Sequence, residues 1–199
     1  TLNKDGKITE ACKNCKKIKS TEAVMKIASV ALSNTTYTYN GKVQTPTVTV
    51  KDSKGKALKK DTDYTVSYAS GRKNVGRYAV TITFKGNYSG TKTLYYNIAP
   101  QGTKVTKLTA RSKGFVVQWA TQKNQTTGYQ IQYSTSSNFS NATTVTMPKN
   151  TYYARNITGR AGGKKHYVRV RTYKTIKFNG KNYNIYSGWS ETKTVTTKR

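Results

Sequence analysis

The sequence predicts an all-β protein in which two consecutive β-sandwiches follow a short β-hairpin. Tyr accounts for 16 residues, and Thr and Val recur throughout, which suits pleated, half-buried sheets. Apolar and polar residues alternate with period two in short runs, and Gly and Asn separate these runs, as is typical of strands and turns. With 199 residues the chain has room for two domains of about 100 residues each.

The first element is a hairpin within residues 1–26. Two strand-like runs, 7–11 and 17–24, flank the tight stretch Cys12-Lys13-Asn14-Cys15. A turn with this spacing can direct two thiolates at one zinc ion, but a structural zinc site needs four ligands. The chain has no other cysteine, so we expect no bound cofactor and favour a Cys12–Cys15 disulfide or two free thiols. Zinc at Cys12 and Cys15 remains an alternative if further ligands come from outside this fragment.

Residues 27–99 form the first predicted sandwich. The alternating runs are 27–32, 47–50, 64–68, 78–84 and 94–98, and turn residues such as Asn40-Gly41 and Gly86-Asn87 separate them. The module ends at Ala99-Pro100-Gln101-Gly102, because proline cannot continue a central strand.

Residues 102–199 form the second predicted sandwich. Strands are expected at 105–110, 114–119, 128–133, 143–147, 152–157, 165–174 and 186–196. Seven strands in about 95 residues match the size of an immunoglobulin-like sandwich. The predicted fold class is therefore all-β, with two tandem immunoglobulin-like β-sandwiches preceded by a short Cys-x-x-Cys β-hairpin.

The second module resembles a fibronectin type III domain. Trp119 ends the second strand, Ile157 precedes the Gly162-Gly163 turn, and the run Tyr167-Val168-Arg169-Val170-Arg171 resembles the tyrosine-corner strand. Trp189-Ser190 precedes the last strand. We expect Trp119 in the core and Trp189 at its margin.

Residues 27–99 resemble the bacterial immunoglobulin-like modules of large surface proteins from Gram-positive gut bacteria. The matching stretches are 37–41, 63–68 and 84–90. The resemblance implies a non-catalytic spacer or adhesion segment of a cell-surface or secreted protein, located outside the cell.

The net charge of +29 is concentrated in the second module, where residues 101–199 carry eighteen Lys and Arg against one acid. Such a surface attracts polyanions, which gives an alternative function: binding a polyanionic wall polymer or glycan through the basic second sandwich. Dispersed lysine that only keeps the protein soluble explains the charge equally well. Expected partners are a cell-wall polymer, a glycan or a host surface protein. We expect a monomer without a membrane span and do not expect nucleic acid, because tyrosine at period two indicates sheet packing.

The sequence does not predict an enzyme. Glu191 is the sole acid of the second module, so no carboxylate pair exists there. The single histidine, His166, lies in a predicted strand and is interpreted as an ordinary sheet residue. Asp61 and Asp63 could bind calcium, but a role in a turn is favoured.

The segment 174–186 extends past the usual end of the sixth strand and contains the hairpin signal Asn179-Gly180. Pairing across this turn places Phe178 opposite Lys181, with Tyr183 and Ile185 on the same face. The apolar face of this ribbon needs cover. We expect it to fold back over its own sandwich or onto the first module or, alternatively, to offer Phe178, Lys181, Tyr183 and Ile185 to a partner.

Overall fold

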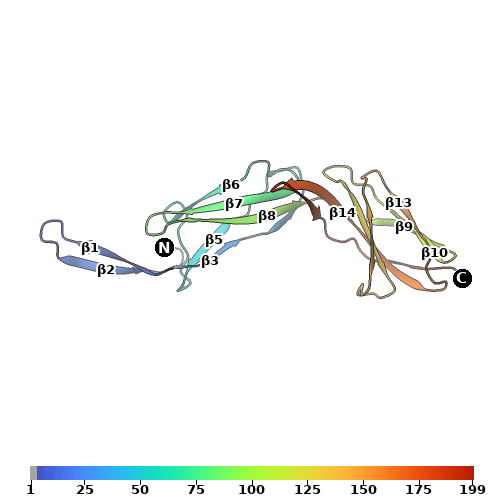
Figure 1. Cartoon of the computed structure of the whole chain (residues 1–199), viewed down its shortest axis with the longest axis horizontal. Helices are drawn as coiled ribbons and strands as arrows, with labels where there is room; N and C mark the ends of the chain where they lie inside the picture. The colour runs from blue at the N-terminus through green and yellow to red at the C-terminus, as the bar shows by residue number, and fades with distance from the viewer. Residues whose placement is uncertain (1–3) are drawn as a thin grey trace. The chain divides into compact units, whose positions relative to one another are not determined.

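The computed structural model describes residues 4–199, apart from the side chains of residues 19–22. Every regular element in this part of the chain is a β-strand, and none of it forms a helix that could cross a membrane. The predicted all-β fold class is confirmed. The chain divides into two compact units (Figure 1), the first formed by Thr1–Tyr37, Val43–Arg72 and Arg77–Asn97, and the second by Thr38–Lys42, Lys73–Gly76 and Ile98–Arg199. The boundaries drawn from the sequence at residues 26 and 99 stay predictions.

The first unit begins with the expected hairpin. Strands β1 (Gly6–Ala11) and β2 (Ile18–Val24) pair antiparallel, with a register shift between Glu10 and Ala11 next to the cysteine turn. This pairing holds Cys12 and Cys15 at the tip of a two-stranded ribbon.

The sandwich of the first unit contains a two-stranded and a four-stranded sheet. The sheet orders are β3-β5 and β4-β8-β7-β6, for strands β3 (Ile27–Leu32), β4 (Thr36–Thr38), β5 (Val48–Asp52), β6 (Tyr64–Tyr68), β7 (Gly76–Phe84) and β8 (Thr91–Ala99). Val50, Val80, Ile82 and Tyr96 are buried between them. The Tyr96 hydroxyl donates to the Gln44 carbonyl at 2.7 Å, and burial raises the pKa of Tyr96 to about 12.

The second unit has a three-stranded sheet in the order β13-β10-β9 and a larger sheet in the order β12-β11-β14-β15, with β16 also paired to β14. This is the arrangement of a fibronectin type III-like sandwich. The strands are β9 (Val105–Arg111), β10 (Gly114–Trp119), β11 (Gly128–Ser134), β12 (Thr143–Met147), β13 (Ala154–Ile157), β14 (Lys165–Phe178), β15 (Lys181–Tyr186) and β16 (Lys193–Thr196). Phe115, Val117, Trp119, Ile131 and Val170 interdigitate in its core.

Strand β11 begins at a glycine because another strand passes too close for a side chain. A Cβ atom on Gly128 would lie 2.1 Å from the Met147 carbonyl oxygen, which is far inside van der Waals contact. The backbones of β11 and β12 therefore approach each other at a point where only glycine fits.

The single strand predicted over residues 186–196 is wrong: the chain forms β15, leaves the sheet after Tyr186 and re-enters it as β16. Two serines take over the pairing with β14 in this gap. Ser187 donates its N–H to the Thr172 carbonyl and accepts the Thr172 N–H on Oγ, both at 3.1 Å. Ser190 pairs with Val170 in the same pattern: it donates its N–H to the Val170 carbonyl at 2.8 Å and accepts the Val170 N–H on Oγ at 3.0 Å. The serine side chains thus satisfy backbone groups that a continuous strand would have paired.

The interpretation of Tyr167 as the tyrosine-corner residue also needs correction. Buried and half-buried residues alternate along β14, and Tyr167 falls on the outer face with Arg169 and Arg171. The inward position at the start of the strand is occupied by His166, in line with Val168.

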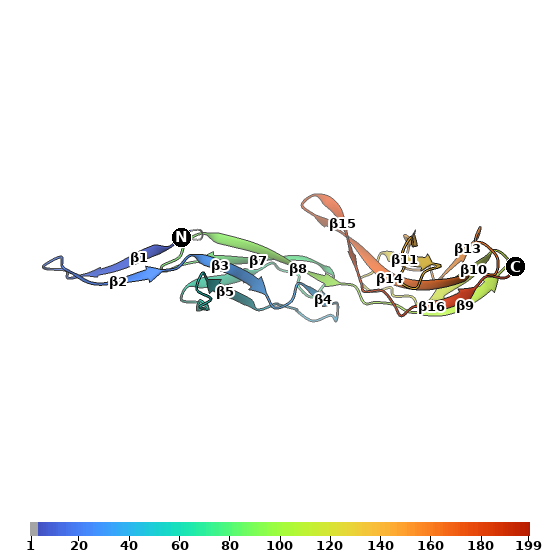
Figure 2. The same ribbon diagram turned by 90° about the horizontal axis from the view of Figure 1, so that it is seen from below.

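The predicted register of the 174–186 ribbon is confirmed. Phe178 pairs with Lys181 and Ile176 with Tyr183, and the turn residues Asn179 and Gly180 have φ of 49° and 76°, as a type I′ turn requires. Figure 2 shows this β14–β15 ribbon extending beyond the other strands of its sheet.

Candidate functional site

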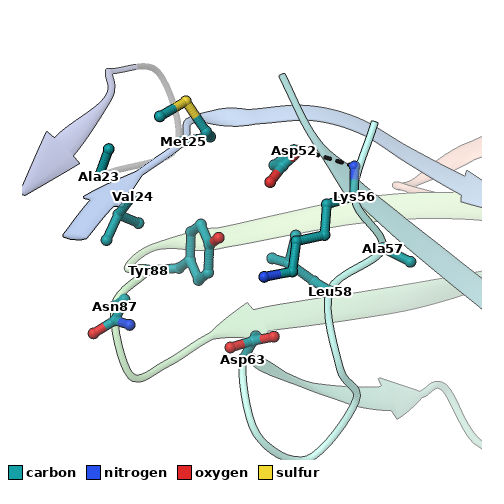
Figure 3. Close-up of a pocket in the computed structure, with 10 residues that line it drawn as sticks. All are labelled: Ala23, Val24, Met25, Asp52, Lys56, Ala57, Leu58, Asp63, Asn87 and Tyr88. Atoms are coloured by element: carbon teal, nitrogen blue, oxygen red, sulfur yellow. Dashed lines mark hydrogen bonds between the residues drawn. The ribbon is translucent and has the colours of Figure 1, made fainter. Parts of the chain in front are cut away.

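Two carboxylates of the first unit, Asp52 and Asp63, stabilise turns. A cavity of about 130 Å³ in this unit is lined by Asp52 and Asp63 (Figure 3). Asp52 accepts the backbone N–H of Lys56 at 2.9 Å, and Asp63 accepts that of Lys59 at 2.7 Å. Asp61 adopts a left-handed φ of 66° in the same loop. These contacts agree with the turn role and leave the calcium alternative without support from the geometry.

The cysteine turn brings Cys12 and Cys15 together as two free thiols. The N–H of Cys12 donates to the Lys17 carbonyl at 2.8 Å, and the N–H of Lys16 donates to the Cys12 carbonyl at 3.0 Å. The backbone N–H of Cys15, its thiol and the N–H of Asn14 all hydrogen-bond to the Cys12 sulfur and lower the pKa of that thiol.

This geometry fits half of a zinc site. A lowered pKa favours the thiolate, which is the form that binds metal. Among the described side chains, however, no three Cys, His, Asp or Glu lie together in a metal-binding group. Zinc at Cys12 and Cys15 therefore stays a proposal that needs two more ligands from another molecule or from chain outside these residues.

The ribbon places the four predicted contact residues in different environments. Ile185 is only 4% exposed and packs with Val75 and Ala99 within the second unit. Its side chain is therefore covered, a correction to its inclusion as a contact residue. Lys181 and Tyr183 are exposed and Phe178 is half-buried. A partner contact through these three residues remains a proposal.

The densest functional chemistry lies on the outer face of β14, which we call the arginine face and define by Gln130, Gln132, Phe139, Arg169, Arg171, Tyr186 and Trp189. Arg169 donates from Nε and Nη2 to Oε1 of Gln132 at 2.8 and 2.5 Å. Arg171 donates in the same way to Gln130 at 3.0 and 2.7 Å. The two guanidinium groups are thus fixed by the neighbouring strand β11.

Aromatic rings alternate with the two guanidinium groups. The central carbon of Arg169 lies 3.8 Å from the ring centre of Phe139 and 4.8 Å from that of Trp189. The central carbon of Arg171 lies 4.2 Å from Trp189 and 3.9 Å from Tyr186. Each cation therefore has an aromatic ring on both sides, and such cation–π contacts are favourable.

Trp189, the central ring of this stack, lies in the segment that connects β15 and β16. Ser187 and Ser190 anchor the gap to β14 through the hydrogen bonds described above, so Gly188 and Trp189 are held over the sheet between two fixed points. A regular strand would point alternate residues toward and away from the sheet. The serine-anchored segment instead places the indole against Arg169 and Arg171.

The guanidinium groups of the arginine face keep hydrogen-bonding capacity. Partial burial lowers the pKa of both Arg169 and Arg171, but arginine stays protonated in proteins. Each group has five N–H donors, and the bonds to glutamine occupy Nε and Nη2. The Nη1 group of each arginine therefore remains to donate to an anion.

The sequence interpretation did not identify this site. It placed Arg169 and Arg171 inside a core strand and Trp189 at the core margin. A usable signal was present, because Gln130-Ile131-Gln132 and Arg169-Val170-Arg171 share the same polar–apolar alternation. Two such strands, when adjacent, must bring the glutamines and arginines to one face.

Comparisons with known proteins find likeness only at the level of structure. No family model and no curated protein matches the sequence. Among solved structures, the FN1–FN3 domains of chicken CNTN1 align over 98% of this chain and 78% of theirs, with 15% identity and a TM-score of 0.44. The two fibronectin type III domain segment of chicken tenascin aligns over 86% and 99%, with 14% identity and a TM-score of 0.44.

A β-1,2-glucanase from Parabacteroides distasonis aligns over 61% of this chain but only 18% of its own length, with 17% identity and a TM-score of 0.38. These likenesses are too weak to transfer an activity in either direction. The description of the second unit as fibronectin type III-like therefore rests on its strand order.

Proposed function

We propose that this chain is a non-catalytic spacer and adhesion segment of an extracellular bacterial protein, and that the arginine face is its adhesive surface. The ligand is an anionic polymer, such as a wall polymer or an acidic glycan. Two sandwiches that follow one another along the sequence supply the spacer, and the resemblance of residues 27–99 to bacterial surface modules supports the location.

The alternating stack of aromatic rings and guanidinium groups carries this proposal. Arg169 and Arg171 lie two residues apart on one strand, which separates them by about 6.6 Å. Their side chains are held in place before any ligand arrives, so binding costs little side-chain entropy. A guanidinium that still has free N–H groups binds phosphate, sulfate or carboxylate through charge-assisted hydrogen bonds.

The charge distribution supports the same ligand class. Residues 101–199 contain eighteen basic residues and one acid. The net positive charge of this module attracts a polyanion that approaches the arginine face. Exposed charges are screened over about 10 Å at 0.1 M salt. Binding through this face should therefore weaken steeply as salt is added.

A retention experiment on purified Gram-positive cell walls and on immobilised poly(glycerol phosphate) tests the proposal. The double variant Arg169→Gln with Arg171→Gln should lose about tenfold or more in affinity, since two charge-assisted contacts disappear. The control, Lys107→Gln with Arg155→Gln, removes two exposed charges from the other sheet and should bind nearly as well as the unchanged protein. Equal losses in both variants would contradict a specific face and indicate diffuse charge attraction.

A purely mechanical spacer is the second candidate. It is favoured by the internal contacts of the arginines, because a stack that is already bonded to Gln130 and Gln132 also stiffens the sheet. In that case the unchanged protein should not be retained at any salt concentration, and the arginine double variant should only lower the unfolding temperature.

A further inference from the structure

The two cysteines lie at the tip of a ribbon that pairs with no other strand in the described part of the chain. Strands β1 and β2 form a two-stranded sheet of their own. Two backbone hydrogen bonds close the turn between them, from the Cys12 N–H to the Lys17 carbonyl at 2.8 Å and from the Lys16 N–H to the Cys12 carbonyl at 3.0 Å. Lys16 takes a left-handed φ of 60°. The tip is therefore a turn with a defined backbone.

The two thiols of this turn lie together and are accessible. The Cys15 thiol hydrogen-bonds to the Cys12 sulfur, so the two sulfur atoms are neighbours. Cys15 is exposed and Cys12 is partly exposed, and Cys12 also lines an open hollow at the tip together with Glu10 and Lys13. Two thiolates on a tetrahedral zinc, each about 2.3 Å from the ion, lie about 3.8 Å from each other. Two hydrogen-bonded sulfur atoms can adopt this separation without rearrangement of the turn.

Hydrogen-bond donors around Cys12 prepare its sulfur for a metal. The N–H of Cys15, the Cys15 thiol and the N–H of Asn14 lower the pKa of Cys12, and the thiolate is the form that binds metal. The two backbone donors stay in place when the Cys15 thiol loses its proton. Hydrogen bonds of this kind orient metal ligands in proteins, so the turn presents its sulfur atoms ready for an ion.

The turn supplies half of the ligands that a structural zinc needs. Such a site takes four protein ligands, whereas the described side chains contain no group of three Cys, His, Asp or Glu. The sequence has no third cysteine, and both ring nitrogens of its single histidine, His166, are buried away from any metal. A second copy of the chain presents the same two thiols, and a two-fold axis through the ion makes the two halves equivalent.

The charges near the tip make the association of two copies depend on the metal. Lys13, Lys16 and Lys17 flank the cysteines, and Glu10 is the single acid between residues 10 and 17, so two metal-free tips repel each other. Four thiolates carry more negative charge than one Zn²⁺ neutralises, so the complete centre is an anion. The lysines of both tips then lie near this anion and offset its charge.

We propose that Cys12 and Cys15 of two copies of this chain bind one zinc ion, which joins the copies tip to tip. Each thiol gives up its proton as it binds, and four sulfur atoms, two from each copy, hold the ion. Without the metal the chain is a monomer. This site belongs to the first unit, so it does not depend on the arginine face or on the proposed function.

Zinc titration of the full chain, kept reduced by a phosphine and followed by analytical ultracentrifugation, tests the proposal. Binding should end at one zinc per two chains, the mass should double, and EDTA should restore the monomer. Cobalt(II) in place of zinc should give the intense visible bands of a tetrahedral four-sulfur site. Three results would overturn the proposal: one metal per chain without a dimer, a dimer that forms without metal, or no binding at ~100 μM metal, far above the Kd of a structural zinc site.

Variants of the tip separate the ligands from their surroundings. Cys12→Ser and Cys15→Ser should each abolish the zinc-dependent dimer and the cobalt bands, while the unfolding temperature without metal stays that of the unchanged protein. Glu10→Gln is the matched control, because it removes the nearby carboxylate and keeps both thiols; it should still bind one zinc per two chains. Loss of binding in Glu10→Gln would indicate a carboxylate ligand, and a zinc-dependent dimer of the double variant Cys12→Ser with Cys15→Ser would place the ion elsewhere. Either result would refute the four-sulfur site.

Discussion

The serine anchors beside β14 make a measurable contribution to stability. In Ser187→Ala the N–H of Thr172, a residue with 0% exposure, loses the oxygen that accepts it at 3.1 Å. An unsatisfied buried donor costs about 1–3 kcal/mol. A loss of roughly 2 kcal/mol lowers the unfolding temperature of a domain of this size by roughly 8–16 °C. Ser190→Ala should act similarly through Val170.

The double variant Ser187→Ala with Ser190→Ala sharpens this test. The two losses together amount to about 2–6 kcal/mol, a large part of the ~5–15 kcal/mol that stabilises an ordinary domain. Both tryptophans, Trp119 and Trp189, belong to the second unit, so urea unfolding followed by tryptophan fluorescence reports on that unit.

Hydrogen exchange provides the second measurement for the serine anchors. The amides of Val170 and Thr172 should exchange faster in the double variant, because their acceptors are gone. Ser137→Ala, which removes an exposed hydroxyl from a loop of the same unit, is the matched control. If both anchor variants unfold within 0.5 kcal/mol of that control, a level of change that is usual at the surface, the serines are not the partners of β14.

Three further predictions follow from other parts of the chain. Gly128→Ala should destabilise the second unit by about 3 kcal/mol or more, because its Cβ would meet the Met147 carbonyl at 2.1 Å, whereas Gly188→Ala, with open space around it, should change little in the same urea assay. Cys12 should react with iodoacetamide at lower pH than an ordinary cysteine, because its pKa is lowered; a pH–rate profile by peptide mass spectrometry that matches a free thiol would contradict this. The lowered pKa of His166 means that the unfolded chain binds the proton more tightly, so stability is complete above about pH 6.5 and falls as the pH drops toward the folded pKa. His166→Tyr should remove this step from the pH dependence of urea unfolding, and persistence of the step would assign it to other groups.

Local patterns predict the strands of this chain well. Tyr64–Tyr68, Gly114–Trp119 and Thr143–Met147 begin and end where the alternation and its flanking turn residues indicate. The ribbon register also follows from sequence, because Asn179-Gly180 fixes the turn type and thereby every pair beyond it.

The errors arise where side chains replace backbone pairing, and where the wrong one of two adjacent residues was expected to face the core. No local pattern in Ser187-Gly188-Trp189-Ser190 shows that the two serines bond to β14 in place of a strand. Likewise, His166 and Tyr167 are adjacent, and the alternation of β14, in which Val168 is buried, puts His166 on the inner face and Tyr167 on the outer face.

The sequence signals the arginine face only in part, because the shared alternation does not show which strands pair. Gln132 and Arg169 lie 37 residues apart and meet because β11 pairs with β14 in one particular register. Phe139 reaches the same face from a loop. Sequence patterns indicate which residues share one side of a strand, but not which strands become neighbours.

The near absence of carboxylates from the second unit gives it an almost permanent charge. Lysine and arginine keep their protons throughout the range in which carboxylates titrate, and between residues 101 and 199 the sequence has a single Asp or Glu, Glu191, and a single histidine, His166. Most proteins become much more positive as they are acidified, whereas this unit starts close to its limit. Its attraction for a strongly acidic polymer should therefore be nearly the same in an acidified medium as in a neutral one, so that ionic strength rather than acidity governs attachment and release.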